Sequence, residues 1–239
     1  MDRLTRRELK QDELRTTFEN FEDFLKERYQ QILTVAGIVL VVVAAAIGLK
    51  IYLDRQVAEA NTELTEALTT FRAQVGTSAP GSLDAGAKMF PTAKERYEKA
   101  LSQFADITQR FPRTKAAAIA RYHVGVCQAQ LGDEVGAIKT LTEASHYSDK
   151  EIASLAQLAL AGELVKTGKL AEAVKIYQDL ANRPTTMVPR VTALLSLADA
   201  YRGTQPLQAR QVYLQLDKEV GAENMLSSYL KQQIERLPK

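Results

Sequence analysis

Few residues in this sequence are of the types that most often perform catalysis or hold metal ions. The chain has two histidines, His123 and His146, and one cysteine, Cys127. The histidines are 23 positions apart, and neither has a cysteine or an acidic cluster at the spacing of metal ligands, so no metal site is expected. Cys127 falls on the apolar side of a predicted helix. We interpret it as a small core residue rather than a nucleophile.

One segment superficially resembles a phosphate-binding loop. It runs from Gly162 to Gly168-Lys169-Leu170, but its spacing is one residue too long, Leu170 replaces the Ser or Thr, and no strand is predicted before it. No Ser-His-Asp set or pair of carboxylates stands out. No cofactor is therefore expected, and we interpret the chain as a binding or scaffolding protein rather than an enzyme.

The charge balance bears on possible partners. Lys and Arg total 31 and Asp and Glu total 29, which leaves a net charge of +2. Nucleic-acid-binding domains usually carry a basic excess, so this balance gives no support for nucleic-acid binding.

Residues 32–49 form an uncharged run in which Thr34 is the only polar residue. Extended past Lys50 to Leu53, the run would span about 33 Å as a helix, enough for a hydrocarbon core of about 30 Å. We interpret residues 32–53 as a single transmembrane anchor. A cleaved signal peptide is the alternative, because small residues lie at positions 44–46. However, the 31 residues before the run exceed a usual signal-peptide n-region.

Basic residues are unevenly distributed on the two sides of this anchor. Residues 1–31 carry seven, whereas residues 54–84 carry only Arg55 and Arg72. The positive-inside rule therefore predicts a cytoplasmic N-terminus. Within this arm an apolar stripe falls at helical spacing, at Leu14, Phe18, Phe21 and Leu25. The arm (residues 1–31) would lie on the membrane surface, pack on a partner helix or remain a solvated lead-in.

Beyond the anchor the composition is typical of a mostly helical protein. Residues 54–76 are predicted as a helical stalk, or else as the first helix of the domain. Residues 77–91, rich in Gly, Ser and Pro, are predicted as a loop. Residues 92–239 then form the main domain, and the fragment 77–239 is expected to fold without the anchor.

The main domain repeats itself at intervals of 35 or 36 residues. Each unit is predicted as two helices joined by a glycine turn, with a small residue where the helices approach and a large residue that fills the space between units. The turn residues are Gly132, Gly168 and Gly203, the small residues are Ala137, Ala173 and Ala209, and the large residues are Leu141, Tyr177 and Tyr213.

These residues resemble the pattern of tetratricopeptide repeats, although the first helices lack the Trp and Tyr of strong repeats, and the turn Gly203-Thr-Gln-Pro206 is one residue out of step. The predicted fold class is therefore all-α, with a single transmembrane helix followed by a tetratricopeptide-like α-solenoid. Residues Ala222–Leu237 would serve as the capping helix that a solenoid needs.

The whole layout resembles the ancillary subunit family of the bacterial SecYEG translocon. That resemblance is architectural, covers roughly residues 32–239, and does not extend to the arm, which is longer than the family usually carries. It implies a periplasmic tetratricopeptide-like domain held at the bacterial inner membrane. The implied partners are translocon subunits, chaperones and client polypeptides.

The first helices of such repeats line a concave face. In the predicted register this face presents Ile119, Tyr122, Val126, Leu155 and Leu158, an apolar groove for a peptide. The alternative is that the protein fills its own groove, for example with residues 56–75. Three functions remain open: a periplasmic accessory of the Sec translocon and chaperones, a scaffold for an envelope or cell-division complex, and a cytosolic-side receptor with reversed topology.

Overall fold

Helix α1 (Arg6–Arg72) contains the apolar run that the sequence predicts to span a membrane. The computed structural model describes residues 6–76, 89–221 and 225–238, with side chains from residue 29 onward except that of Ile32. The arm's apolar stripe lies outside these described side chains. In the described apolar window no residue is buried within the protein, and Leu40 is 69% exposed. This helix is long and apolar enough to cross a membrane.

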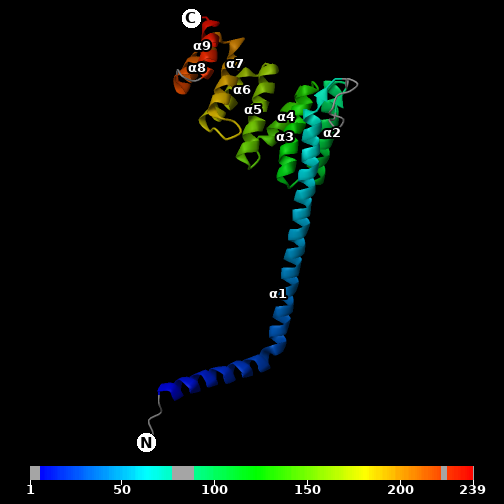
Figure 1. Ribbon diagram of the computed structural model, residues 1–239, viewed down its shortest axis with the longest axis vertical. Helices are drawn as coiled ribbons and strands as arrows, with labels where there is room; N and C mark the ends of the chain where they lie inside the picture. Colours follow the sequence, from blue (N-terminus) through cyan, green and yellow to red (C-terminus); the bar gives the residue numbers. More distant parts are fainter. Residues whose placement is uncertain (1–5, 77–88, 222–224, 239) are drawn as a thin grey trace, which may run out of the picture. The chain divides into compact units, whose positions relative to one another are not determined.

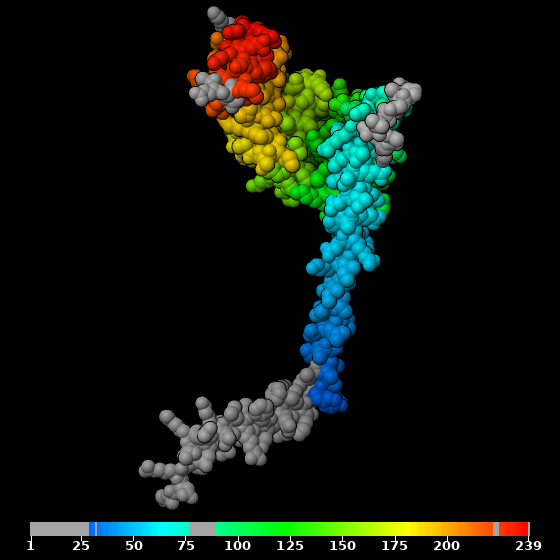
Figure 2. Space-filling model, in the orientation of Figure 1, coloured from blue at the N-terminus to red at the C-terminus, as the bar shows by residue number. Residues whose placement is uncertain are grey.

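The chain divides into two compact units, Met1–Arg55 and Gln56–Lys239, and the division falls inside α1. Residues 56–72 of α1 therefore belong to the second unit. Ala60, Leu64 and Ala67 are buried in one apolar cluster with residues of α2 (Ala93–Arg110) and α3 (Lys115–Gln130). Figure 2 shows this part of α1, in cyan, lying against the green helices.

This packing differs from the predicted stalk over residues 54–76. The physical reason is that Ala60, Leu64 and Ala67 follow one another at helical spacing, and water would otherwise surround that apolar stripe. Residues 56–72 therefore form the first helix of the repeat domain, which is the alternative to a stalk that the sequence left open.

A short parallel pair of strands follows α1. Strand β1 (Gln74–Val75) pairs with β2 (Met89–Phe90), and the N–H of Gly76 donates to the carbonyl of Phe90 at 3.0 Å. Residues 77–88, most of the predicted loop, lie outside the described residues. The strand pair therefore holds the end of α1 beside the start of α2.

The remaining helices are α4 (Glu134–Ala144), α5 (Lys150–Lys166), α6 (Leu170–Asn182), α7 (Arg190–Arg202), α8 (Pro206–Val220) and α9 (Met225–Glu235). Each helix from α2 to α9 packs against the next one in sequence, and α3, α5 and α7 also touch in order. Figure 1 shows these helices stacked in chain order from green to red. This confirms the all-α, solenoid-like class that the repeats predict.

Side-chain caps fix the first residues of several helices. Thr92, Thr114, Asp133 and Asp149 each accept a hydrogen bond from a backbone N–H in the first turn of α2, α3, α4 and α5. Such a cap satisfies an N–H that has no partner inside the helix and typically contributes about 1 kcal/mol. Helix α8 begins instead with Pro206, whose fixed φ suits a first helical position.

The first two repeat turns have the same backbone. Gly132 and Gly168 have φ values of 85° and 80°, in the left-handed region that favours glycine. In each turn the N–H of the next residue donates back to a carbonyl five positions earlier, at 2.9 Å for Asp133 and 2.8 Å for Lys169. This hydrogen bond is the signature of a glycine-terminated helix.

The third turn departs from this pattern. Gly203 is the C-cap residue of α7, but its φ is −80°, outside the left-handed region in which Gly132 and Gly168 lie. The N–H of Gln205 donates to the carbonyl of Tyr201 at 2.7 Å, and α8 starts directly afterwards at Pro206. Since a proline restricts the residue before it and supplies no N–H, it imposes a different turn here.

The other repeat positions lie in the core. Ala137, Ala173 and Ala209 have no exposed surface, and Leu141, Tyr177 and Tyr213 are at most 5% exposed. From Leu141 onward the buried residues form a second cluster that extends to Leu230 of α9. Helix α9 therefore covers the end of the solenoid, and Ser227 ties it to α8 by donating to Asp217 at 2.6 Å.

Candidate functional site

The five residues of the predicted apolar groove lie on two helices that touch. Ile119, Tyr122 and Val126 are on α3, and Leu155 and Leu158 are on α5. All five are half-buried. Tyr122, Leu155 and Leu158 pack against the larger core cluster, and Ile119 packs against the cluster that contains residues 60–67 of α1. Much of their apolar surface therefore already serves the fold.

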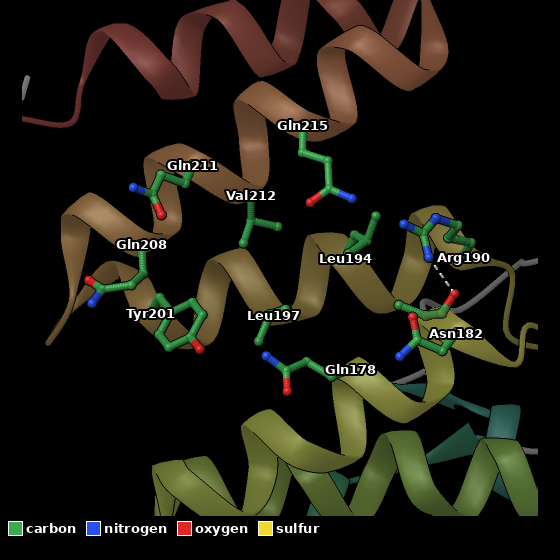
Figure 3. Close-up of a pocket in the computed structure, with 11 residues that line it drawn as sticks. Gln178, Asn182, Arg190, Leu194, Leu197, Tyr201, Gln208, Gln211, Val212 and Gln215 are labelled. Atoms are coloured by element: carbon green, nitrogen blue, oxygen red, sulfur yellow. Dashed lines mark hydrogen bonds between the residues drawn. The ribbon is translucent and has the colours of Figure 1, made fainter.

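A different pocket lies between α6, α7 and α8, and it has a volume of about 440 Å³. This volume falls within the range of ligand pockets in proteins. It contains none of the five predicted groove residues. Figure 3 shows its lining residues: Gln178, Ala181, Asn182, Arg190, Leu194, Leu197, Tyr201, Gln208, Gln211, Val212 and Gln215.

The floor of this pocket is apolar and comes from the buried side of α7. Leu194 and Leu197 are each 4% exposed, and Val212 of α8 is half-buried beside them. The stacking of the repeats produces this arrangement, because α7 packs against both α6 and α8. The second helices of two successive units therefore form the walls, and the first helix of the later unit forms the floor.

Side-chain amides occupy both walls. Gln208, Gln211 and Gln215 lie on α8 at spacings of three and four residues, and so share one helix face. Gln178 and Asn182 lie on α6 with the same four-residue spacing. All five side chains are exposed to solvent. Figure 3 shows Gln178 on the opposite side of the pocket from Gln208 and Gln211.

Four of these amides have no hydrogen-bond partner in the described part of the chain: Gln178, Asn182, Gln208 and Gln211. Gln215 donates to Glu219 at 2.9 Å. A side-chain amide offers two N–H donors and one carbonyl acceptor. The four amides therefore leave both donors and acceptors available to a ligand.

Arg190 is the only charged residue among the pocket's lining residues, and its charge is balanced. Its Nε and Nη2 atoms each donate to a carboxylate oxygen of Glu219 at 3.1 Å, and its Nη1 donates to the carbonyl of Ala181 at 2.6 Å (Figure 3). The hydrogen bonds to Glu219 raise the pKa of Arg190. The same hydrogen bonds lower the pKa of Glu219, so this pair stays ionised. The pocket consequently presents no uncompensated charge.

A hydrogen-bonded cluster holds α7 against α8. The hydroxyl of Tyr213 donates to Asp199 at 2.6 Å and accepts from Arg202 at 2.9 Å. Burial, followed by the hydrogen bond to Asp199, raises the pKa of Tyr213 to about 12. The hydroxyl therefore stays protonated at neutral pH and serves packing rather than acid-base chemistry.

Cys127, Gly168 and Lys169 do not line this pocket. Cys127 is fully buried in α3, and burial raises the pKa of its thiol to about 12, which disfavours the reactive thiolate. Gly168 is a repeat turn, and Lys169 is the N-cap residue of α6. Across the described ranges, no group of three or more His, Cys, Asp or Glu side chains could hold a metal ion. The pocket between α6, α7 and α8, which we call the amide pocket, is therefore suited to hydrogen bonding with an uncharged ligand.

Sequence reasoning missed this pocket. The spacing of Gln208, Gln211 and Gln215 on a predicted helix would have revealed the amide row. It would not have revealed the amides of α6 on the facing wall, since that depends on how two repeats stack.

No known protein family, curated protein or solved structure matches this chain.

Proposed function

We propose that this chain is a membrane-anchored, tetratricopeptide-like binding protein that assists the Sec translocon and its periplasmic chaperones. The observation that carries the proposal is the pocket between α6, α7 and α8, which has no uncompensated charge and has four side-chain amides free to bind a ligand. Such a pocket suits polypeptides that emerge from a translocon, because those polypeptides have exposed backbone groups and no fixed sequence.

The N-terminal part of the chain supports the proposed location at a bacterial inner membrane. The apolar stretch of α1 is long enough to span a membrane, and residues 56–72 of the same helix belong to the repeat unit. The excess of basic residues before the span favours a cytoplasmic N-terminus and a periplasmic repeat unit in a bacterial inner membrane. Tethering raises the effective concentration of the pocket near other proteins of that membrane, so modest affinity is sufficient.

Site-specific photo-crosslinking in secreting cells tests this function. A photoreactive amino acid replaces Gln211 in the pocket, and the matched control places it at Gln232, an exposed glutamine on α9. We expect crosslinks from position 211 to a secretory polypeptide arrested during translocation, and markedly fewer from position 232.

The opposite outcomes are equally informative. Equal capture from positions 211 and 232, or none from either, would remove the support for a role in secretion. Crosslinks to a fixed set of membrane proteins, unchanged when secretion is blocked, would favour the envelope or cell-division scaffold instead.

A further inference from the structure

We propose that the pocket between α6, α7 and α8 binds the main chain of a short, extended polypeptide segment through its glutamine and asparagine side chains. This proposal deepens the proposed function and rests on it for the source of the segment, a chain emerging from the translocon. The ligand is thereby specified by its backbone rather than by its side chains.

The side-chain amides of the pocket have the same hydrogen-bonding groups as a peptide bond. A carboxamide presents an N–H donor and a carbonyl acceptor side by side, as a peptide group does, so it pairs with a backbone N–H and C=O. An extended backbone leaves both groups open, which is how an added strand binds to a sheet edge. Gln178, Asn182, Gln208 and Gln211 supply such groups without losing an existing partner in the described structure.

The positions of the amides suit an extended chain. Gln208 to Gln215 covers seven helical steps, or about 10 Å along α8. Three residues of an extended chain cover about the same distance. Gln178 and Asn182 face this row from α6, with Leu197 and Tyr201 between the walls (Figure 3). A segment lying along α7 would therefore meet amides on both of its edges.

The charge and floor of the pocket narrow the choice of ligand. The guanidinium of Arg190 already donates hydrogen bonds to Glu219 and to the carbonyl of Ala181. The lining therefore offers no unpaired cation to bind a phosphate or a carboxylate. A quarter of all residues in the chain are charged, but Arg190 is the only charged one of the eleven lining residues, and Glu219 balances its charge. Val212 and the small exposed parts of Leu194 and Leu197 offer limited apolar contact to small side chains that point toward α7. An uncharged backbone with small side chains fits these walls and this floor.

Backbone methylation provides a direct test. The full-length protein in mild detergent is titrated into a fluorescein-labelled peptide of serine, alanine and valine, and binding is followed by fluorescence anisotropy. A scrambled peptide should bind with an unchanged dissociation constant. A peptide with methyl groups on alternate backbone nitrogens should bind about tenfold more weakly, because each methyl group removes a hydrogen-bond donor.

Variants of the protein test the same contacts from the other side. Gln208→Met combined with Gln211→Met keeps side-chain size and should weaken binding of the unmethylated peptide about tenfold. Gln232→Met, the matched control on α9, should leave it unchanged, and circular dichroism should show equal helicity for all variants. Undiminished binding of the methylated peptide, no effect of the double substitution, or no peptide binding would each overturn the proposal. So would a dimer that the double substitution dissociates, because a second copy would then occupy the pocket.

This experiment separates the two proposals. If the peptide binds as expected but position 211 captures no secretory chain, the ligand class stands and the role in secretion falls. If position 211 captures secretory chains but methylation changes nothing, the role stands and backbone recognition is wrong.

Discussion

Gly125 allows helix α3 to approach α4 more closely than any larger residue would. A Cβ atom added at this position would lie 2.7 Å from Cγ and 2.8 Å from Cδ2 of Leu141, which is itself fully buried. Real carbon atoms do not approach so closely, so either the helix pair or Leu141 would have to move. Gly162 lies 37 positions later, in the corresponding helix of the next repeat. A Cβ there would meet only the hydroxyl of Tyr177, at an ordinary distance of 3.9 Å.

We therefore expect Gly125→Ala and Gly162→Ala to have opposite effects. Overpacking against Leu141 should cost about 1–3 kcal/mol in the first variant, which exceeds the gain of about 1 kcal/mol from replacing a helical glycine. In the second variant only the gain remains, so its unfolding free energy should rise. Thermal and urea unfolding followed by circular dichroism measure both. Destabilisation by both substitutions, or by neither, would contradict this account of α3 and α4.

At the scale of the elements, an aromatic cluster joins α1, α2 and α3. The ring of His123 stacks on Phe104, with centroids 4.8 Å apart, and Phe71 and Tyr122 meet it edge-on at 5.1 and 4.9 Å. Its Nδ1 atom is buried and has no hydrogen-bond partner in the described part of the protein. Burial, followed by the positive charge of Arg72, lowers the pKa of His123 to about 4. The cluster therefore requires a neutral imidazole.

The stability of the repeat domain should consequently depend on pH. The ordinary pKa of histidine is about 6.5. Between pH 6.5 and pH 4, His123 is therefore protonated in the unfolded chain but neutral in the folded chain. The stabilisation is fully present above pH 6.5 and is lost as the pH falls toward 4, by an amount on the order of 2–3 kcal/mol. His123→Phe should flatten this part of the stability profile. A profile unchanged by His123→Phe would show that the imidazole is protonated freely in the folded state.

The helices that pack here were partly predictable from sequence. Ala60, Leu64 and Ala67 have the spacing of a buried helix face, and the apolar run before them predicts the membrane-spanning stretch. The spacing does not say which helices cover that face, because the intervening segment of residues 77–88 separates them from α2. The sequence therefore left a stalk and a domain helix as alternatives.

The candidate site, too, was only partly predictable from sequence, because periodicity does not show which helices face each other. Periodic residues such as Ala173 and Tyr177 predict the repeat, because each unit must bury the same positions against its neighbours. The amide pocket depends on α6 and α8 facing each other across α7, and these belong to successive units. The turn that sets this geometry is also the one that departs from the repeat, since Gly203 does not adopt the left-handed conformation of Gly132.

At the scale of the whole molecule, the division between the two units falls at Arg55 and Gln56, inside a helix rather than in a linker. Helix α1 thus contributes to both units: the apolar side chains described between Leu33 and Leu53 are exposed, and Ala60, Leu64 and Ala67 are buried. Arg110 of α2 adds ion pairs to Glu59, at 2.7 Å, and to Glu63. The repeat domain consequently begins about twenty residues before the loop that composition suggests as its boundary.

This boundary predicts how fragments of the protein behave. The fragment 56–239 should be soluble, strongly helical and cooperative in unfolding, because it retains the whole apolar cluster around Phe104 and Ile107. The fragment 77–239, which the sequence suggested as an independent unit, should be less stable by at least about 3 kcal/mol, because it loses Leu64 and its buried neighbours.

Within the full chain, Ala60→Glu should reproduce this loss by burying a charge, whereas Asn61→Glu, at an exposed position on the same helix, should have little effect. Urea unfolding monitored by circular dichroism compares all four proteins. Equal stability of the two fragments would mean that residues 56–72 form a free stalk after all, and that α2 and α3 bury their shared face without them.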